Sequence, residues 1–114
     1  MEIKLKRVYE KYDKNDGYRI LVDRLWPRGL KKEDLKIDLW LKDIAPSNDL
    51  RKWFGHKEDN WEEFSEKYKK ELDKKKEILN QIRVLEKSNK IITFLYGAKD
   101  KIHNQAVVLK NYLT

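Results

Sequence analysis

The sequence predicts an α/β domain: a small, largely parallel sheet with helices packed on it in Rossmann-like layers. Three observations support this. Residues 90–96 form an apolar, β-branched and aromatic run without polar alternation, as in a strand buried on both faces. Segments with helical apolar spacing precede and follow this run, and turn residues separate them from it. The chain has 114 residues, so we expect one domain with one core over residues 1–114.

Two further strands are predicted near the start of the chain. Residues 2–8 alternate apolar and polar side chains, which is the period of a half-buried strand. Residues 11–17 form a polar turn cluster, and residues 18–23 follow as a second, more apolar strand. Pro27 and Gly29 end regular structure after it.

The segment that follows is ambiguous. Residues 33–35 fit one turn of helix, and the stretch after them alternates enough to be a strand or an extended chain. In either case we expect Ile37, Leu39 and Leu41 to share one face, with Trp40 on the other.

Cap residues predict where the next two helices begin. Ser47 is a suitable N-cap for a short helix over residues 48–54, which Gly55 would close. Asn60 and Glu63 have the spacing of a capping box at the start of a second helix.

Two core-facing stripes follow, and then a final helix. The first stripe is Trp61, Phe64, Tyr68 and Leu72, and the second is Ile78, Leu79, Ile82 and Leu85. Residues 73–77 interrupt them, so the region is either one long helix or two helices joined at a kink, ending at Ser88-Asn89. After the polar loop 97–104, Asn104 would cap a last helix with apolar positions Ala106, Val107, Leu109 and Leu113.

Composition limits the chemistry. The chain has no cysteine, which excludes thiol nucleophiles, disulfides and thiolate metal sites. It has no apolar run long enough for a signal peptide or a membrane span, so we expect a cytoplasmic protein without a membrane partner. The formal net charge of +7 favours anionic partners, although much of the lysine is interleaved with glutamate and is typical of a solvated helix face.

The best candidate site follows the second strand, in the stretch DRLWPRG at residues 23–29. Ligands of α/β sheets bind beyond the carboxyl ends of the strands. Arg24 and Arg28 carry planar donor groups suited to phosphate or carboxylate, and Asp23 and Trp26 stand beside them. The alternative is structural: Asp23 pairs with one arginine, and the other lies along the indole.

Two other polar-aromatic clusters also stand at predicted element ends. Arg51, Trp53 and His56 are at the end of the short helix, where His56 would be a general acid or base, or only a cap. Tyr96, His103 and Asn104 flank the loop after the last strand; Tyr96 is a second proton-transfer candidate, and the other two are ligand-binding or capping candidates.

Several site classes lack their motif. No phosphate-cradling glycine loop, no metal-ligand spacing and no serine placed for a hydrolase triad is present, so we expect neither a metal nor a cofactor. No dense arginine helix or aromatic strand motif for nucleic acid is present either, although the charge keeps that partner open. The oligomeric state is also left open.

The sequence resembles the YeaO-like family, domain of unknown function 488. The resemblance covers nearly the whole chain and rests on GYRILVDRLWPRGL, DLWLKDIAPSNDLRKWFGH, W-x-x-F-x-x-x-Y-x-x-E-L at 61–72 and TFLYGAKDKIHNQAVVLKNYL. It implies one cytoplasmic α/β domain without an assigned reaction. It also implies that the polar and aromatic residues of these stretches are a shared set: Asp23, Arg24, Trp26, Arg28, Lys42, Asp43, Ser47, Arg51, Trp53, Phe54, His56, Tyr96, Asp100 and Asn104.

The chain departs from a branch of this family that has cysteines in the loop after the last strand. Tyr96 and Ala98 stand where that branch has a cysteine and a glutamate. The residues His103, Asn104 and Gln105 replace its Cys-His-Arg. Thiol chemistry therefore does not transfer, and the positive charge of a site would have to come from elsewhere in the chain.

These observations lead to one main hypothesis and two alternatives. In the first, Arg24, Arg28 and Arg51 hold a small anion such as a phosphate, nucleotide or carboxylate, in a binding protein or an enzyme. It requires the side chains of Arg24, Arg51 and His56 to line one concave site. The alternatives are a nucleic-acid-binding accessory protein and a non-catalytic interaction domain with an exposed indole.

Overall fold

The core of the fold is a four-stranded, all-parallel sheet. The computed structural model describes residues 2–114, in which β1 (Glu2–Arg7), β2 (Tyr18–Leu21), β3 (Leu39–Trp40) and β4 (Ile91–Tyr96) pair in the order β1-β4-β2-β3. β4 lies between β1 and β2, and its last five residues are buried. This central position explains why its sequence has no polar alternation.

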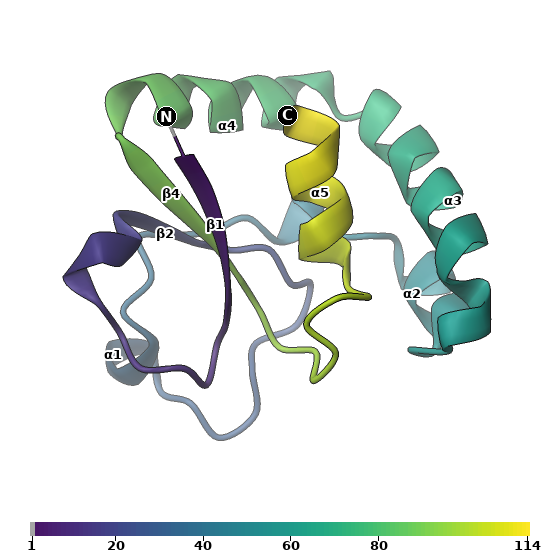
Figure 1. Cartoon of the computed structure of the whole chain (residues 1–114), viewed down its shortest axis with the longest axis horizontal. Coiled ribbons are helices and arrows are strands. Elements are labelled where there is room, and N and C mark those ends of the chain that lie inside the picture. Colours follow the sequence, from purple (N-terminus) through teal and green to yellow (C-terminus); the bar gives the residue numbers. More distant parts are fainter. Residues whose placement is uncertain (1) are drawn as a thin grey trace.

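Five helices complete the fold: α1 (Lys32–Leu35), α2 (Asn48–Phe54), α3 (Trp61–Asp73), α4 (Lys76–Ser88) and α5 (Gln105–Leu113). Figure 1 shows α5 between the strands and α3, with α4 running along one end of the sheet. Of the two possibilities for residues 61–88, one long helix or two joined at a kink, the structure has two helices, α3 and α4. The predicted α/β class, with helices packed on a parallel sheet, is confirmed.

Alternate side chains of the strands enter two separate apolar clusters. In the larger cluster, Ile20, Phe94 and other inward residues of the sheet pack against buried residues of α2 to α5. In the smaller one, Leu21 and Leu95 pack with Leu35 of α1 and the half-buried side chains Trp26, Leu30, Ile37 and Trp40. The sheet is therefore covered on both faces, by four helices on one and by α1 with its flanking chain on the other.

The local cap predictions have mixed outcomes. Ser47 accepts from the Leu50 amide at the start of α2, and Gly55 closes that helix in the left-handed conformation, as predicted. The capping box at Asn60 and Glu63 is wrong, because Asn60 makes no side-chain cap bond. A 3-10 turn runs directly into α3 and leaves Asn60 with φ −93° and ψ 2°, not the extended backbone that a capping side chain requires.

The expectation for the segment before β3 is also partly wrong. Leu39 and Leu41 do pack in the larger cluster, with Trp40 on the opposite face. Ile37, however, packs beside Trp40. The reason is that the chain bends at Asp38 and β3 begins only at Leu39, so the side-chain alternation of the strand does not extend back to Ile37.

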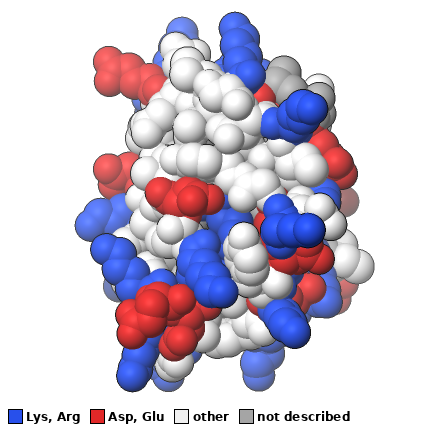
Figure 2. Space-filling view, turned by 90° about the vertical axis from the view of Figure 1, so that its left-hand side faces the viewer, with Lys and Arg blue, Asp and Glu red and all other residues white. Residues whose placement is uncertain are grey.

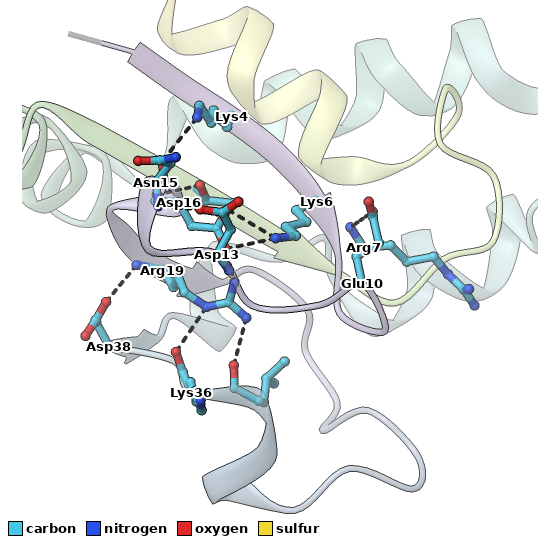
Figure 3. A network of polar contacts seen from close by, with 12 residues as sticks. Lys4, Lys6, Arg7, Glu10, Asp13, Asn15, Asp16, Arg19, Lys36 and Asp38 are labelled. Carbon is cyan, nitrogen blue, oxygen red and sulfur yellow. Dashed lines mark hydrogen bonds and ion pairs between the residues drawn. The ribbon is translucent and has the colours of Figure 1, made fainter.

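A buried polar network joins β1, the β1–β2 connection and the chain after α1 (Figure 3). Arg19 is 2% exposed, and its guanidinium donates to the Asp16 carboxylate and to the carbonyls of Leu35 and Lys36. Lys6 Nζ donates to Asp16 as well, at 3.0 Å. Arg19 therefore fastens the small α1 layer to the strands.

Charges are mixed on the surface seen in Figure 2. Lysine and arginine are interspersed there with aspartate and glutamate, and uncharged surface lies between them. That face carries no continuous basic strip of the kind a nucleic-acid backbone would need. Within residues 2–114, none of the helices has both the length and the hydrophobicity of a membrane span.

Candidate functional site

A pocket of about 360 Å³ opens beyond the carboxyl ends of β2 and β4. In Figure 1 the loops that follow these two strands lie at the same end of the sheet. The sequence stretch DRLWPRG supplies one wall, α2 and the chain before it supply a second, and the loop after β4 supplies a third. The lining residues are Tyr9, Asp23, Arg24, Leu25, Trp26, Pro27, Arg28, Ala45, Pro46, Arg51, Phe54, His56, Phe64, Gly97, Ala98 and Gln105.

Asp23 is the half-buried acid of this pocket. Its Oδ2 accepts from the Gly97 amide at 2.8 Å, and its Oδ1 accepts from the Gln105 side-chain amide. A β-carbon at Gly97 would lie 3.0 Å from Oδ2, so glycine permits this close approach. Burial raises the pKa of Asp23 to about 6, although the bonds from Gly97 and Gln105 and the charge of Arg51 oppose the increase.

Arg24 shapes the second wall. Its Nε and Nη2 donate to the carbonyls of Pro46 and Ala45, at 3.1 and 3.2 Å. Lys75 Nζ also donates to this loop, to the carbonyls of Asp43 and Ala45. These donors hold a loop that has no partner strand, and the loop leads directly into the start of α2. Arg24 is therefore largely committed to positioning the pocket.

The end of α2 brings a cation and an imidazole to the pocket. Arg51 and Phe54 are three residues apart and share one helix face, with Arg51 exposed and Phe54 buried. The ring of Phe54 stacks on Phe64 at a centroid distance of 4.2 Å and forms part of the apolar lining. His56 follows Gly55 with φ 56°, an uncommon conformation for a residue with a side chain.

The corner of DRLWPRG is anchored by its indole. Trp26 Nε1 donates to the Leu30 carbonyl at 2.7 Å, and its ring meets Trp40 edge-on at 5.4 Å. Arg28, in contrast, is exposed beside the pocket. The alternative in which Asp23 pairs with a neighbouring arginine is wrong, since within residues 2–114 no ion pair joins Asp23 to Arg24 or Arg28.

The structure brings together six of the residues singled out from sequence: Asp23, Arg24, Trp26, Arg28, Arg51 and His56. Four others lie elsewhere. Tyr96 is 2% exposed in the larger core, and burial, with the nearby charge of Glu10, raises its pKa, which disfavours ionisation. Trp53 lies on the outer face of α2, with Lys67 Nζ 4.1 Å from its ring centroid.

His103 and Asn104 make their contacts outside the pocket. His103 Nδ1 lies 2.8 Å from Asp100, and the edge of its ring meets Trp61. The hydrogen bonds from the His103 amide and side chain and from Ile102 lower the pKa of Asp100 to about 2. Asn104 is buried and caps α5 by accepting from the Val107 amide, as its sequence position predicts.

Gln105 is the main pocket residue that sequence reasoning did not select. It is the first residue of α5 and donates to Asp23 across 82 positions of sequence. Its position in the sequence could have indicated it. Gln105 is a polar residue directly after the helix cap Asn104, and the helix it begins follows a strand of the parallel sheet. Within residues 2–114 no cluster of three His, Asp or Glu side chains suits a metal ion.

Comparison with known proteins identifies the family. A model described as the inactive DUF488-N3 subclade matches residues 2–114. The chain belongs to this family. The chain is also 44% identical to the uncharacterized protein YeaO of Escherichia coli (strain K12), over 99% of this chain and 97% of that one. The resemblance to the YeaO-like family is therefore confirmed.

The chain also has relatives in mycobacteria. The uncharacterized proteins Mb3100c of Mycobacterium bovis and Rv3073c of Mycobacterium tuberculosis are 46% identical to it over 70 residues. These alignments cover 61% of this chain and 59% of each relative. No solved structure matches the chain.

Proposed function

We propose that the protein binds a small anionic molecule in the pocket beyond β2 and β4, without transforming it. One observation carries this proposal: Arg28 from the stretch after β2, and Arg51 and His56 from α2 and its end, line one concave site whose wall Arg24 holds in place. Guanidinium groups at the ends of parallel strands are a suitable environment for a carboxylate or a phosphate.

The chemistry of the pocket supports binding rather than catalysis. Of the two proton-transfer candidates, Tyr96 is buried in the core, so His56 alone faces the pocket. The chain contains no cysteine, and its family is described as an inactive subclade. Retention of a bound anion needs only the arginines and the apolar lining.

Arg51→Ala tests the proposal because Arg51 is exposed and supports no part of the backbone through its guanidinium. We expect it to weaken binding of 3-phenylpropionate, an apolar carboxylate, about fivefold to tenfold, as loss of one charge-assisted contact would. Isothermal titration calorimetry measures the change. Arg83→Ala is the matched control, because it removes an exposed arginine from α4 and lowers the net charge equally.

The outcome of this pair separates a site from general electrostatic attraction. Equal losses in the two variants would mean that the anion responds only to net charge, and the proposal would then be wrong. A loss confined to Arg51→Ala supports the pocket.

The affinity for this carboxylate should also depend on pH. The pKa of Asp23 is about 6, so its carboxyl group is neutral below that pH and negative above it. We therefore expect 3-phenylpropionate to bind about threefold to tenfold more weakly at pH 7.5 than at pH 5.5, where an ordinary carboxylate ligand is still ionised. The Asp23→Asn variant should lose the part of this pH response that comes from Asp23.

Other charged groups face the same space. Arg28, Arg51 and His56 also line the pocket. Repeating the titrations with His56→Gln isolates the contribution of Asp23. A pH response that survives in Asp23→Asn and disappears in His56→Gln would contradict the assignment to Asp23.

A further inference from the structure

The pocket holds opposite charges that do not pair with each other. Asp23 and Arg28 stand five residues apart on the wall formed by DRLWPRG, and Arg51 stands on the wall formed by α2. Within the described chain no ion pair joins Asp23 to an arginine, although Arg51 is close enough to lower the pKa of the acid. A space bounded by an acid and by bases that do not touch can accept a ligand that contacts both.

Asp23 retains the capacity for such a contact. Each carboxylate oxygen can accept about two hydrogen bonds. The Gly97 amide occupies one position on Oδ2, and the Gln105 amide occupies one on Oδ1. One acceptor position therefore remains on each oxygen of a carboxylate that lines the pocket.

The lining near these charges is apolar. Leu25, Pro27 and the rings of Phe54 and Phe64 all contribute to it. Leu25 is 60% exposed, so its side chain is available to a ligand in the pocket. A ligand with an apolar body would cover these surfaces while its polar ends reach the charged groups.

We propose that the ligand is a small zwitterion with an apolar body, whose ammonium group binds Asp23 and whose anionic group binds Arg51 and Arg28. This inference rests on the proposed function and names its ligand class. A plain anion would leave the Asp23 carboxylate uncompensated beside a second negative charge. A plain cation would face the arginines with no counter-charge of its own.

Three probes that share a phenyl ring and a short chain test the inference at pH 7.5. They are L-phenylalanine, which is a zwitterion, 3-phenylpropionate, which has only the carboxylate, and 2-phenylethylamine, which has only the ammonium group. We expect L-phenylalanine to bind about tenfold or more tightly than either of the others, as one additional charge-assisted hydrogen bond would provide. Calorimetric titration of the full chain measures all three.

Two variants assign the two ends of the ligand. Asp23→Asn should reduce the affinity for L-phenylalanine to about that for 3-phenylpropionate, and Arg51→Ala should weaken both. Thermal unfolding of each variant shows whether it is folded, and the probe comparison in the unmodified protein does not depend on any variant. The pH response adds a further check: raising the pH from 5.5 to 7.5 should strengthen zwitterion binding and weaken anion binding.

The outcomes separate this inference from the function on which it rests. Equal binding of L-phenylalanine and 3-phenylpropionate, weakened by Arg51→Ala, would overturn the zwitterion inference and leave the anion site standing. Tightest binding of 2-phenylethylamine would overturn both. Absence of binding by all three probes up to about 10 mM would likewise overturn both.

Discussion

Arg19→Met should lower the free energy of unfolding by about 3–5 kcal/mol, a large part of the total stability of a domain of this size. The guanidinium is buried and holds the Asp16 carboxylate together with the carbonyls of Leu35 and Lys36 (Figure 3). Methionine fills similar volume but donates nothing, so a buried acid and two carbonyls lose a partner. Urea unfolding followed by circular dichroism measures the change.

A double variant separates the buried charge from simple loss of packing. In Asp16→Asn/Arg19→Met the carboxylate is gone as well, so we expect part of the stability to return relative to Arg19→Met alone. If the double variant is less stable than the single one by the full cost of Asp16→Asn, the two side chains act independently and the explanation is wrong.

The pH dependence of stability gives the same network a second readout. Burial of Asp16 would raise its pKa, but hydrogen bonds from Lys6, the Asp13 amide and Arg19 outweigh burial and lower it below 3.8. A lowered pKa in the folded state stabilises the fold above the unfolded value and loses that contribution as the pH falls. Removal of Arg19 should therefore flatten the loss of stability in acid below about pH 4.

Local sequence information was sufficient for most of the fold. Ser47 and Gly55 delimit α2 because a cap side chain and a left-handed glycine act within one helical turn. Arg19 was not recognised as buried, because its burial depends on Leu35 and Lys36, which reach it only after the chain folds back. No glycine or proline marks the bend at Asp38, so the face on which Ile37 lies could not be predicted.

Some residues of the candidate site could be predicted from the sequence, and others could not. Asp23 and Arg24 were identified because parallel strands end at a common edge, which follows from the fold class alone. In a helix as short as α2, the sequence does not show which polar side chains face the pocket. Arg51 lines the pocket, whereas Trp53, two positions on, lies on the opposite side of the helix and contacts Lys67. His103 was selected as a ligand-binding or capping candidate. In the structure its amide and its ring both bond to the Asp100 carboxylate.

Gly17→Ala should be among the most destabilising single changes in the chain, at about 4 kcal/mol or more. Gly17 has φ 67° and ψ −135°, a conformation largely restricted to glycine. A β-carbon there would also lie 2.2 Å from the carbonyl oxygen of Ile91, at the start of the central strand. Because that oxygen belongs to the backbone of β4, relief of the clash would displace β2 from β4.

Gly29→Ala is the matched control for this change. Gly29 has a similar φ of 77°, but a β-carbon there would meet nothing within 4 Å. We expect it to cost only the backbone strain, about 1–2 kcal/mol. Urea unfolding of both variants therefore compares a positive-φ glycine whose β-carbon would clash with one whose β-carbon would not. Equal costs would show that the contact with Ile91 adds nothing to the cost at position 17.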